Sequence, residues 1–390
     1  MKNPLDPQVL HYIQHRILDH QGPFFVYDTN LLYNNIHHIK SLCDRYNIDI
    51  KYAMKANPHN QILKMMCDHQ IWVDASSEYE VLHAKSVYLS WAHIDLNSQQ
   101  LPYDISHHMY DDISRVATSL HQLEMIGKNR PWSCVWIRIN PWVWSAINVK
   151  VNTWWHKSSF GIWYEYIDQA IDIADHYRLT IDTLHTHIWS WSDPEVWLSI
   201  LGIMLDIASR FDHLKYINIW WGMKVARMLD EKYTDVNHIL PLLSDSVLSH
   251  NIAYHTNYKL QIEPWTRFVA NVWYIVTQII DITDTWSDGY QFIKLNTGMN
   301  DIIRPTMYGA RHPIYPCLVE YENNTTYVVA WHCCESWDTI TVDVNWDPLE
   351  IPLPQMHVWD RLIIWWCGAY CASMSCKWYN NYPTSPEYFV

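Results

Sequence analysis

Lys55 is the residue whose type and surroundings point most directly to chemistry. It lies in the segment KYAMKANPH, just after a short apolar run at 51–54 that is typical of a β-strand. At the carboxyl end of a barrel strand, a lysine stands where the active sites of such folds lie. Its amine can form a Schiff base with an aldehyde cofactor. A solvated charge at a strand end is the simpler interpretation, and the lysine alone does not exclude it.

The elements that must position Lys55 are strands and helices in alternation. Leu32, Ile36 and Ile39 share one face of a predicted helix, which Asp28 or Thr29 can cap. Similar helical patterns separate most of the apolar runs. Eight strands with intervening helices predict a (β/α)8 barrel of the TIM type. The predicted strands lie at 51–54, 72–75, 94–97, 114–117, 135–139, 183–188, 216–220 and 259–263.

The pattern changes near residue 266, where strand-like segments follow one another with few helices between them. These segments are VANVWYIVTQIIDIT, YQFIKLNTG, TTYVVAWH and DRLIIWW, and FFVYD near the N-terminus is similar. The predicted fold class is therefore α/β, with a barrel over 29–265 and a C-terminal β-domain over 266–390. Residues 1–28 are a candidate addition to the β-domain.

Composition and charge exclude several classes of function. The 27 basic and 41 acidic residues give a formal net charge of −14, whereas a nucleic-acid partner needs a basic stripe. No apolar run reaches ~18 residues, and the N-terminal segment lacks the apolar core of a signal peptide. The nine cysteines have no framework spacing and indicate a reduced, cytoplasmic protein. No His/Cys cluster has zinc spacing, so we expect no metal, membrane or nucleic-acid partner.

Several short motifs resemble those of one enzyme family. YAMKAN resembles the cofactor-lysine motif of the alanine-racemase-like barrel decarboxylases, and the other motifs follow in that family's order over about residues 24–382. The chain is therefore identified as similar to the diaminopimelate decarboxylase family of fold-type-III enzymes. The resemblance implies pyridoxal 5'-phosphate as cofactor and decarboxylation of a small amino acid substrate. The further motifs are VDASSEYE, IRINP, HKSSFGIW, LHTHIWS, INIWWGM, QIEPW, TGMNDIIRPTMYGA, CCESWD and GAYCASMSCKWYN.

The resemblance assigns cofactor-binding roles by position. Lys55 resembles the lysine that carries the cofactor, and His187 resembles the histidine that stacks on the pyridine ring. Glu263 resembles the acid that pairs with the pyridine nitrogen and keeps it protonated. Without the resemblance, His187 is better interpreted as a core histidine at a strand end. The positions that match the phosphate-binding region are Ser190, Trp220, Trp221, Gly222 and Tyr370.

The substrate residues that the resemblance implies lie in the β-domain. Arg304 and Tyr308 resemble the groups that grip the distal carboxylate of diaminopimelate, and an arginine fork suits a carboxylate. Cys334 resembles the catalytic cysteine that enters from a second subunit, which implies a homodimer. Glu335 resembles the acid that reads the distal ammonium, and Tyr370 is a further contact. A buried small side chain for Cys334, and solvated charges for Arg304 and Glu335, are the simpler alternatives.

Two functions stay open beside diaminopimelate decarboxylation to L-lysine. One is a decarboxylase of the same fold that acts on ornithine, arginine or a carboxylated polyamine. Relatives of the ornithine type typically have Asp after the cysteine, so Glu335 together with Arg304 favours diaminopimelate. Against it, EPWT has Thr266 where the commoner pattern has arginine, and Arg267 comes one residue later. The other function is a non-catalytic homologue with an impaired cofactor site.

Tryptophan stands at many positions where the family has glycine. The chain has 24 tryptophans and 9 glycines, where average usage of ~7% predicts ~27 glycines. Glycine reaches φ > 0 and lets the backbone approach a ligand, and tryptophan does neither. We therefore expect weak or no binding of pyridoxal phosphate. The positions are Trp142, Trp144, Trp154, Trp155, Trp189, Trp191, Trp220, Trp221, Trp265, Trp331 and Trp337.

Overall fold

The chain folds into two compact units in a computed structural model. One, here called the barrel unit, comprises Ile36–Val225 and Lys232–Arg267. The other, the sheet unit, comprises Met1–Asn35, Ala226–Glu231 and Phe268–Val390. The domain limits predicted at residues 265 and 266 stay a prediction. The structure describes residues 5–87, 94–141, 158–188, 193–317, 324–336, 338–343 and 345–390.

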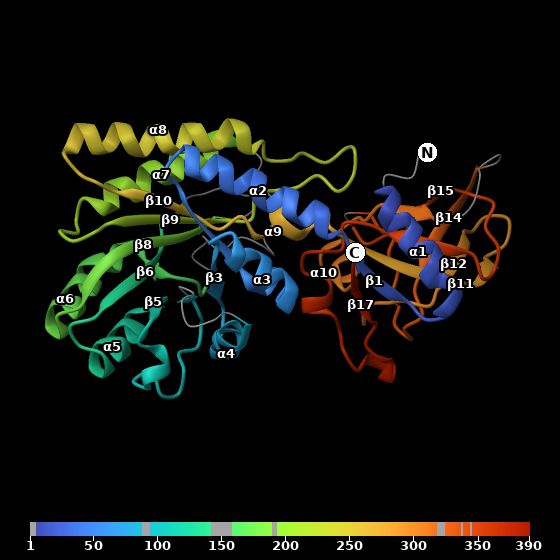
Figure 1. The fold of residues 1–390 in the computed structure, drawn as a ribbon, viewed down its shortest axis with the longest axis horizontal. Helices are drawn as coiled ribbons and strands as arrows, with labels where there is room; N and C mark the ends of the chain where they lie inside the picture. The colour runs from blue at the N-terminus through green and yellow to red at the C-terminus, as the bar shows by residue number, and fades with distance from the viewer. Residues whose placement is uncertain are drawn as a thin grey trace. The chain divides into compact units, whose positions relative to one another are not determined.

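The barrel unit contains a closed ring of eight parallel strands. Figure 1 labels β3, β5, β6, β8, β9 and β10 of this ring. The ring closes because β10 pairs with β2 at one seam and β5 pairs with β6 at the other. A short strand, β7 (Ile162–Trp163), is added beside β6. All eight predicted strands are present, so the predicted barrel is confirmed. The ring consists of β2 (Asp49–Ala53), β3 (Trp72–Ala75), β4 (Ile94–Leu96), β5 (Ile113–Ala117), β6 (Cys134–Asn140), β8 (Thr180–Ile188), β9 (Tyr216–Trp221) and β10 (Lys259–Ile262).

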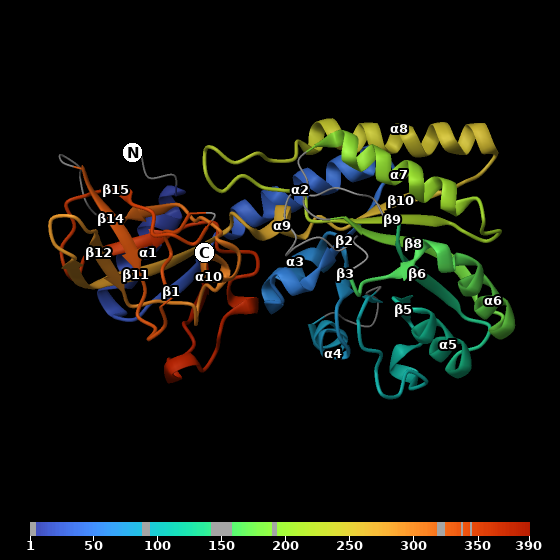
Figure 2. The ribbon, with the colours of Figure 1, turned by 180° about the vertical axis from the view of Figure 1, so that it is seen from behind.

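Helices cover the outside of the ring, as in α7 and α8, which lie side by side over β9 and β10 (Figures 1 and 2). The Asp28 carboxylate begins α2 by accepting a hydrogen bond of 2.8 Å from the Leu31 N–H, so Asp28 rather than Thr29 is the cap. None of the helices in the described ranges is long and apolar enough to cross a membrane. They are α2 (Thr29–Arg45), α3 (Asn60–Asp68), α4 (Glu78–Val87), α5 (Leu120–Asn129), α6 (Ile167–Tyr177), α7 (Pro194–Ala208), α8 (Val236–Tyr254) and α9 (Trp265–Val269), with short 3-10 turns at η1 (Met54–Ala56), η2 (His108–Tyr110) and η4 (Tyr164–Tyr166).

The sheet unit is built on a mixed sheet that includes the N-terminal strand. β1 (Phe24–Tyr27) pairs antiparallel with β11 and parallel with β17, so segments from both ends of the chain lie side by side. Helix α1 (Pro7–Asp19), which the sequence reasoning did not predict, packs Val9 and Ile13 against Phe24 and Val26. The other elements are β11 (Trp273–Asp284), β12 (Gln291–Leu295), α10 (Arg304–Tyr308), β13 (Ile314–Pro316), β14 (Asn324–Ala330), β15 (Ile351–Pro354), β16 (Arg361–Ile364), η5 (Ala372–Met374), η6 (Tyr379–Asn381) and β17 (Glu387–Phe389).

Several tryptophans adopt a backbone conformation that favours glycine. Their φ angles lie between 64° and 79°, in the left-handed region where a Cβ atom is strained. Trp286 and Trp378 are also 85% and 81% exposed, so packing of the indole does not offset the strain. Trp265 and Trp331 do not share this conformation, and both are buried. The described tryptophans with positive φ are Trp132, Trp286, Trp346, Trp359, Trp366 and Trp378.

We predict that Trp286→Gly and Trp359→Gly each stabilise the protein by about 1 kcal/mol, because each relieves left-handed strain at an exposed ring. The measurement is the free energy of unfolding from urea titration. Trp286→Ala keeps the Cβ atom and serves as the matched control. Trp163→Gly, at φ −62°, is expected to destabilise. A Trp286→Gly protein no more stable than Trp286→Ala would contradict the explanation.

Candidate functional site

Lys55 lies in η1, directly after β2, at the carboxyl end of the barrel strands. His187 lies near the end of β8, and Glu263 directly follows β10, so both occupy the same end of the ring. The side chains of Lys55 and Glu263 interact electrostatically. The barrel therefore brings these three residues to one end, although Lys55 and Glu263 are more than 200 positions apart in the sequence.

Burial makes Lys55 an unusual lysine. Burial, with a smaller contribution from the charge of Arg138, lowers the pKa of the Lys55 amine to about 8. Asp74 opposes this shift. A larger fraction of the amine is therefore neutral near pH 7 than in an exposed lysine. Only the neutral amine attacks an aldehyde, so the environment favours Schiff-base chemistry at this position.

Glu263 is buried and keeps one oxygen for a further partner. The Asn218 amide donates a hydrogen bond of 2.8 Å to Oε1, whereas Oε2 is buried without a hydrogen-bond partner among the described residues. Burial raises the pKa of Glu263 to about 7, and the charge of Asp95 adds to the shift. A cationic N–H donor at Oε2 would satisfy that oxygen and stabilise the carboxylate.

His187 faces the indole of Trp265. The two rings are nearly parallel, at 12°, with centroids 5.8 Å apart. The Lys55 Nζ atom also lies 5.8 Å from the Trp265 ring centroid. Burial lowers the pKa of His187 well below its usual value, so the imidazole is neutral and suits stacking. Trp265 therefore occupies space beside both the lysine amine and the stacking face of the histidine.

Four further buried residues join this site, although the sequence reasoning gave them no role. Burial raises the pKa of Asp74 well above its usual value, and burial lowers the pKa of Arg138 to about 10. His185 and Asn218 are fully buried in β8 and β9. Each is a polar residue within a predicted barrel strand, in the segments VDA, IRIN, HTH and INI. A polar residue at such a position is the signal from which they could have been predicted.

The predicted phosphate-binding residues are only partly described. Gly222 is buried and follows β9, and Trp221 is the last residue of that strand, with a side chain outside the description. Ser190 lies outside the described residues, as do seven of the predicted tryptophan positions: Trp142, Trp144, Trp154, Trp155, Trp189, Trp191 and Trp337. Tyr370 lies in the sheet unit, half-buried, at φ 59°.

The predicted substrate residues lie in the sheet unit. Arg304 and Tyr308 begin and end α10, with the guanidinium carbon 5.8 Å from the tyrosine ring centroid. Cys334 and Glu335 are exposed. The Cys334 N–H donates a hydrogen bond of 2.8 Å to Asn380, and the Tyr379 hydroxyl donates one of 3.1 Å to Glu335. The alternative of a buried Cys334 side chain is therefore wrong.

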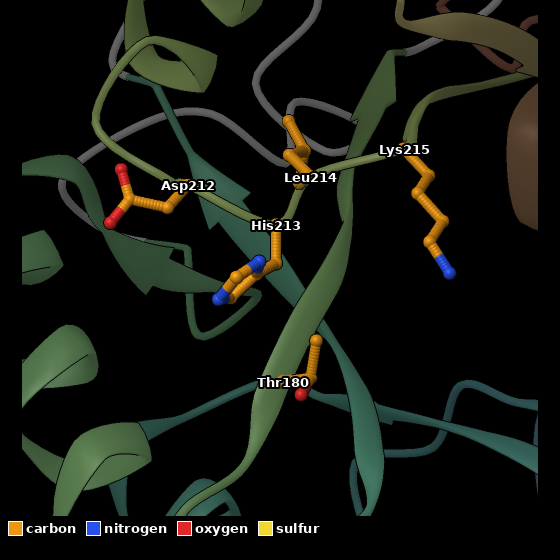
Figure 3. A pocket seen from close by; sticks show the side chains of 5 residues that line it. All are labelled: Thr180, Asp212, His213, Leu214 and Lys215. Atoms are coloured by element: carbon orange, nitrogen blue, oxygen red, sulfur yellow. The ribbon is translucent and has the colours of Figure 1, made fainter.

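A shallow pocket of about 420 Å³ lies elsewhere on the barrel unit (Figure 3). Thr180 begins β8 and Lys215 precedes β9, so the pocket is at the amino end of the strands, opposite to Lys55. Asp212 and Lys215 point away from one another in Figure 3. In the described ranges, no group of three or more His, Cys, Asp or Glu side chains could hold a metal ion. The charged site around Lys55 is thus the stronger candidate for catalysis.

The barrel-unit residues fit pyridoxal phosphate in their chemistry. Lys55 offers a partly neutral amine for the aldehyde, and Glu263 offers an unpartnered oxygen for the ring nitrogen. His187 offers a neutral ring for stacking. Trp265 is the feature that opposes the fit, because its indole lies beside the amine and the imidazole.

Comparisons with known proteins agree with this chemistry. Residues 24–368 match the family model described as pyridoxal-dependent decarboxylase, C-terminal sheet domain. The diaminopimelate decarboxylase of Escherichia coli K12 is 28% identical over 385 residues, which are 94% of this chain and 88% of that protein. A crystal structure of a diaminopimelate decarboxylase superposes with a TM-score of 0.84 at 26% identity and covers 94% of this chain and 88% of its own. A lysine/ornithine decarboxylase from Vibrio vulnificus, complexed with putrescine, shares the fold, with a TM-score of 0.79, 16% identity and 99% of both chains covered.

We predict that Trp265→Gly increases the affinity for pyridoxal phosphate at least ~10-fold, because it removes the ring beside Lys55 and His187. The measurement is titration of the purified chain with the cofactor, followed by the visible absorption of the lysine-bound form.

Two controls test the origin of that gain. Lys55→Ala in the same background should abolish the absorption band. Trp331→Gly, a buried tryptophan of the sheet unit, should leave cofactor affinity unchanged. Equal affinity of the Trp265→Gly and parent proteins would show that the indole does not obstruct the cofactor.

Proposed function

The chain belongs to the pyridoxal-dependent decarboxylases, and we propose that its substrate is meso-2,6-diaminopimelate, which it converts to L-lysine and CO2. The family uses pyridoxal phosphate, and its members are lyases. The E. coli relative supports the substrate, with 28% identity over 94% of this chain. In the net reaction, one carboxyl group leaves as CO2 and a proton takes its place on the same carbon.

The barrel-unit residues are proposed to hold the cofactor. Lys55 is the attachment point for the aldehyde, Glu263 pairs with the ring nitrogen, and His187 stacks on the ring. When bound, pyridoxal phosphate supplies an electron-withdrawing ring that takes up the electrons left by departing CO2. Glu263 supports this by holding a proton on the ring nitrogen through its unpartnered oxygen. Ser190, Trp221, Gly222 and Tyr370 are proposed to contact the phosphate end.

The surroundings of Arg304 are the observation that best supports the proposed substrate. Its side chain is half-buried, its Nε atom is buried without a hydrogen-bond partner, and no carboxylate of the described residues forms an ion pair with it. An anion stabilises a guanidinium that is partly removed from water, and the distal carboxylate of diaminopimelate supplies one. Tyr308 is proposed to join this contact. Glu335, which is exposed, is proposed to bind the distal ammonium group.

A decarboxylase for ornithine, arginine or a carboxylated polyamine is the second candidate. The likeness to the Vibrio vulnificus enzyme supports it only at the level of the fold. Ornithine has no second carboxylate, so it would leave Arg304 without a counter-charge. A non-catalytic homologue is the third candidate, and the position of Trp265 favours it.

We predict that diaminopimelate is turned over at least ~10-fold more efficiently than ornithine, because a charge-assisted hydrogen bond contributes about 1.5–3 kcal/mol. Arg304→Gln should remove most of that preference. The measurement is kcat/KM from CO2 release, in the parent chain and in the Trp265→Gly background. A preference for ornithine would refute the role of Arg304. A folded protein with no turnover in either background, despite bound cofactor, would favour the non-catalytic homologue.

We further propose that the chain acts as a homodimer in which Cys334 works in the partner subunit's site. Its exposed position on the sheet unit suits a residue that a second subunit uses.

The dimer predicts complementation. Mixing inactive Lys55→Ala and Cys334→Ala proteins should restore up to about a quarter of the activity, because a random two-fold dimer then contains some intact shared sites. Cys376→Ala, at a half-buried cysteine of the same unit, is the control, and it should stay active without a complementing partner. Sedimentation of the parent as a monomer at micromolar concentration would contradict the dimer.

A further inference from the structure

Arg227 lies in a short segment of the sheet unit, 226–231, which forms ion pairs with Arg311. The Arg311 guanidinium donates to both carboxylate oxygens of Asp230 at 2.8 Å and lies 3.7 Å from Glu231. The Arg227 backbone N–H donates a hydrogen bond of 2.9 Å to the Glu231 carboxylate. Because Arg311 follows α10 closely in sequence, these contacts tie the segment that carries Arg227 to the helix that begins with Arg304.

The two arginines are half-buried and lie close enough to act on each other electrostatically. Burial lowers the pKa of Arg227 to about 9, and the charge of Arg304 adds to the shift. The Nε atom of each arginine is buried without a hydrogen-bond partner among the described residues. Both arginines also act electrostatically on His312 and on Cys367, whose Sγ lies 3.8 Å from the His312 ring.

The groups described around the arginines balance their charge only in part. Burial lowers the pKa of His312 well below its usual value, so its ring is uncharged. Burial raises the pKa of the Cys367 thiol well above its usual value. Burial opposes ionisation of Cys371, but the hydrogen bond with Cys367 and the two arginines lower its pKa. The Glu231 carboxylate favours the Arg227 charge, but it is shared with Arg311 and with a backbone N–H.

Two like charges that are partly removed from water destabilise each other unless an anion lies between them. Arg267, one residue after Thr266, has different surroundings. The groups that act on it electrostatically are Asp235 and Tyr233, and neither arginine of the pair is among them.

We propose that Arg227 is a second arginine that binds, together with Arg304, the distal carboxylate of the substrate. This inference rests on the proposed function and deepens it. Two guanidinium groups can hold one carboxylate through more hydrogen bonds than a single fork provides. Arg227 is therefore a specificity-determining residue, which distinguishes substrates that keep a carboxylate at the far end from those that do not.

The test compares L-lysine with cadaverine, which differ only in the carboxylate that lysine retains. Calorimetric titration of the full chain with pyridoxal phosphate present gives a Kd for each ligand. We expect the parent to bind L-lysine ~10–100-fold more tightly, and Arg227→Gln and Arg304→Gln each to reduce that ratio about tenfold or more. The variants are compared by this ratio of Kd values because the ratio does not depend on the fraction of active protein in each preparation. Arg267→Gln is the matched control and should keep the ratio of the parent.

Two further measurements separate ligand binding from a structural role. Without ligand, Arg227→Gln should raise the urea midpoint of unfolding, because it removes one of two repelling charges. A residue that merely stabilises the fold would lower it. Arg227→Lys serves if the glutamine variant does not fold, and it should give an intermediate ratio because it keeps the charge and loses the fork.

The outcomes distinguish this inference from the proposed function. If Arg227→Gln keeps the parent ratio while Arg304→Gln loses it, the role of Arg227 is overturned and the proposed substrate stands. If the parent itself does not prefer L-lysine to cadaverine, both are overturned. Inorganic phosphate that displaces L-lysine at an equal concentration would show a general anion site and overturn the role of Arg227 in specificity.

Discussion

Buried charge at the carboxyl end of the barrel strands is the constraint on which the candidate site depends. Ionised groups removed from water are stabilised by opposite charges, by hydrogen bonds, or by a shift toward the neutral form. All three occur here. The pKa values of Lys55 and Arg138 are lowered, and those of Asp74 and Glu263 are raised. Deeper in the barrel, Lys51 and Asp95 form a direct ion pair.

This distribution of charge favours a neutral, nucleophilic amine at Lys55. The same burial that makes Lys55 more often neutral also leaves a Glu263 oxygen without a partner. A ligand with an aldehyde and a protonated ring nitrogen matches both needs at once. The sheet unit presents a different balance, because the Arg227 and Arg304 cluster contains positive charges without a free carboxylate among the described residues. Its natural complement is an anion.

Tryptophans act in two physically different ways in this chain. Trp286, Trp359 and Trp378 are exposed and have positive φ, so their effect is backbone strain. Trp265 has no such strain but is buried beside Lys55, so its effect is occupied volume. Strain changes the stability of the whole unit, whereas occupied volume changes what the site can bind. The same excess of tryptophan over glycine can therefore leave the fold intact and still affect the site.

The sequence by itself determined the barrel strands and indicated candidate residues for the site. Alternation of apolar runs and helical patterns predicted all eight barrel strands, because local hydrophobic periodicity encodes them. Motif order pointed to Lys55, His187 and Glu263. Only the tertiary structure decided which buried groups act on each other, because pKa shifts depend on contacts between distant segments. The closeness of Trp265 to Lys55, and the cluster formed by Arg227 with Arg304, arise from ring closure and from ion pairs far apart in sequence, which no local pattern contains.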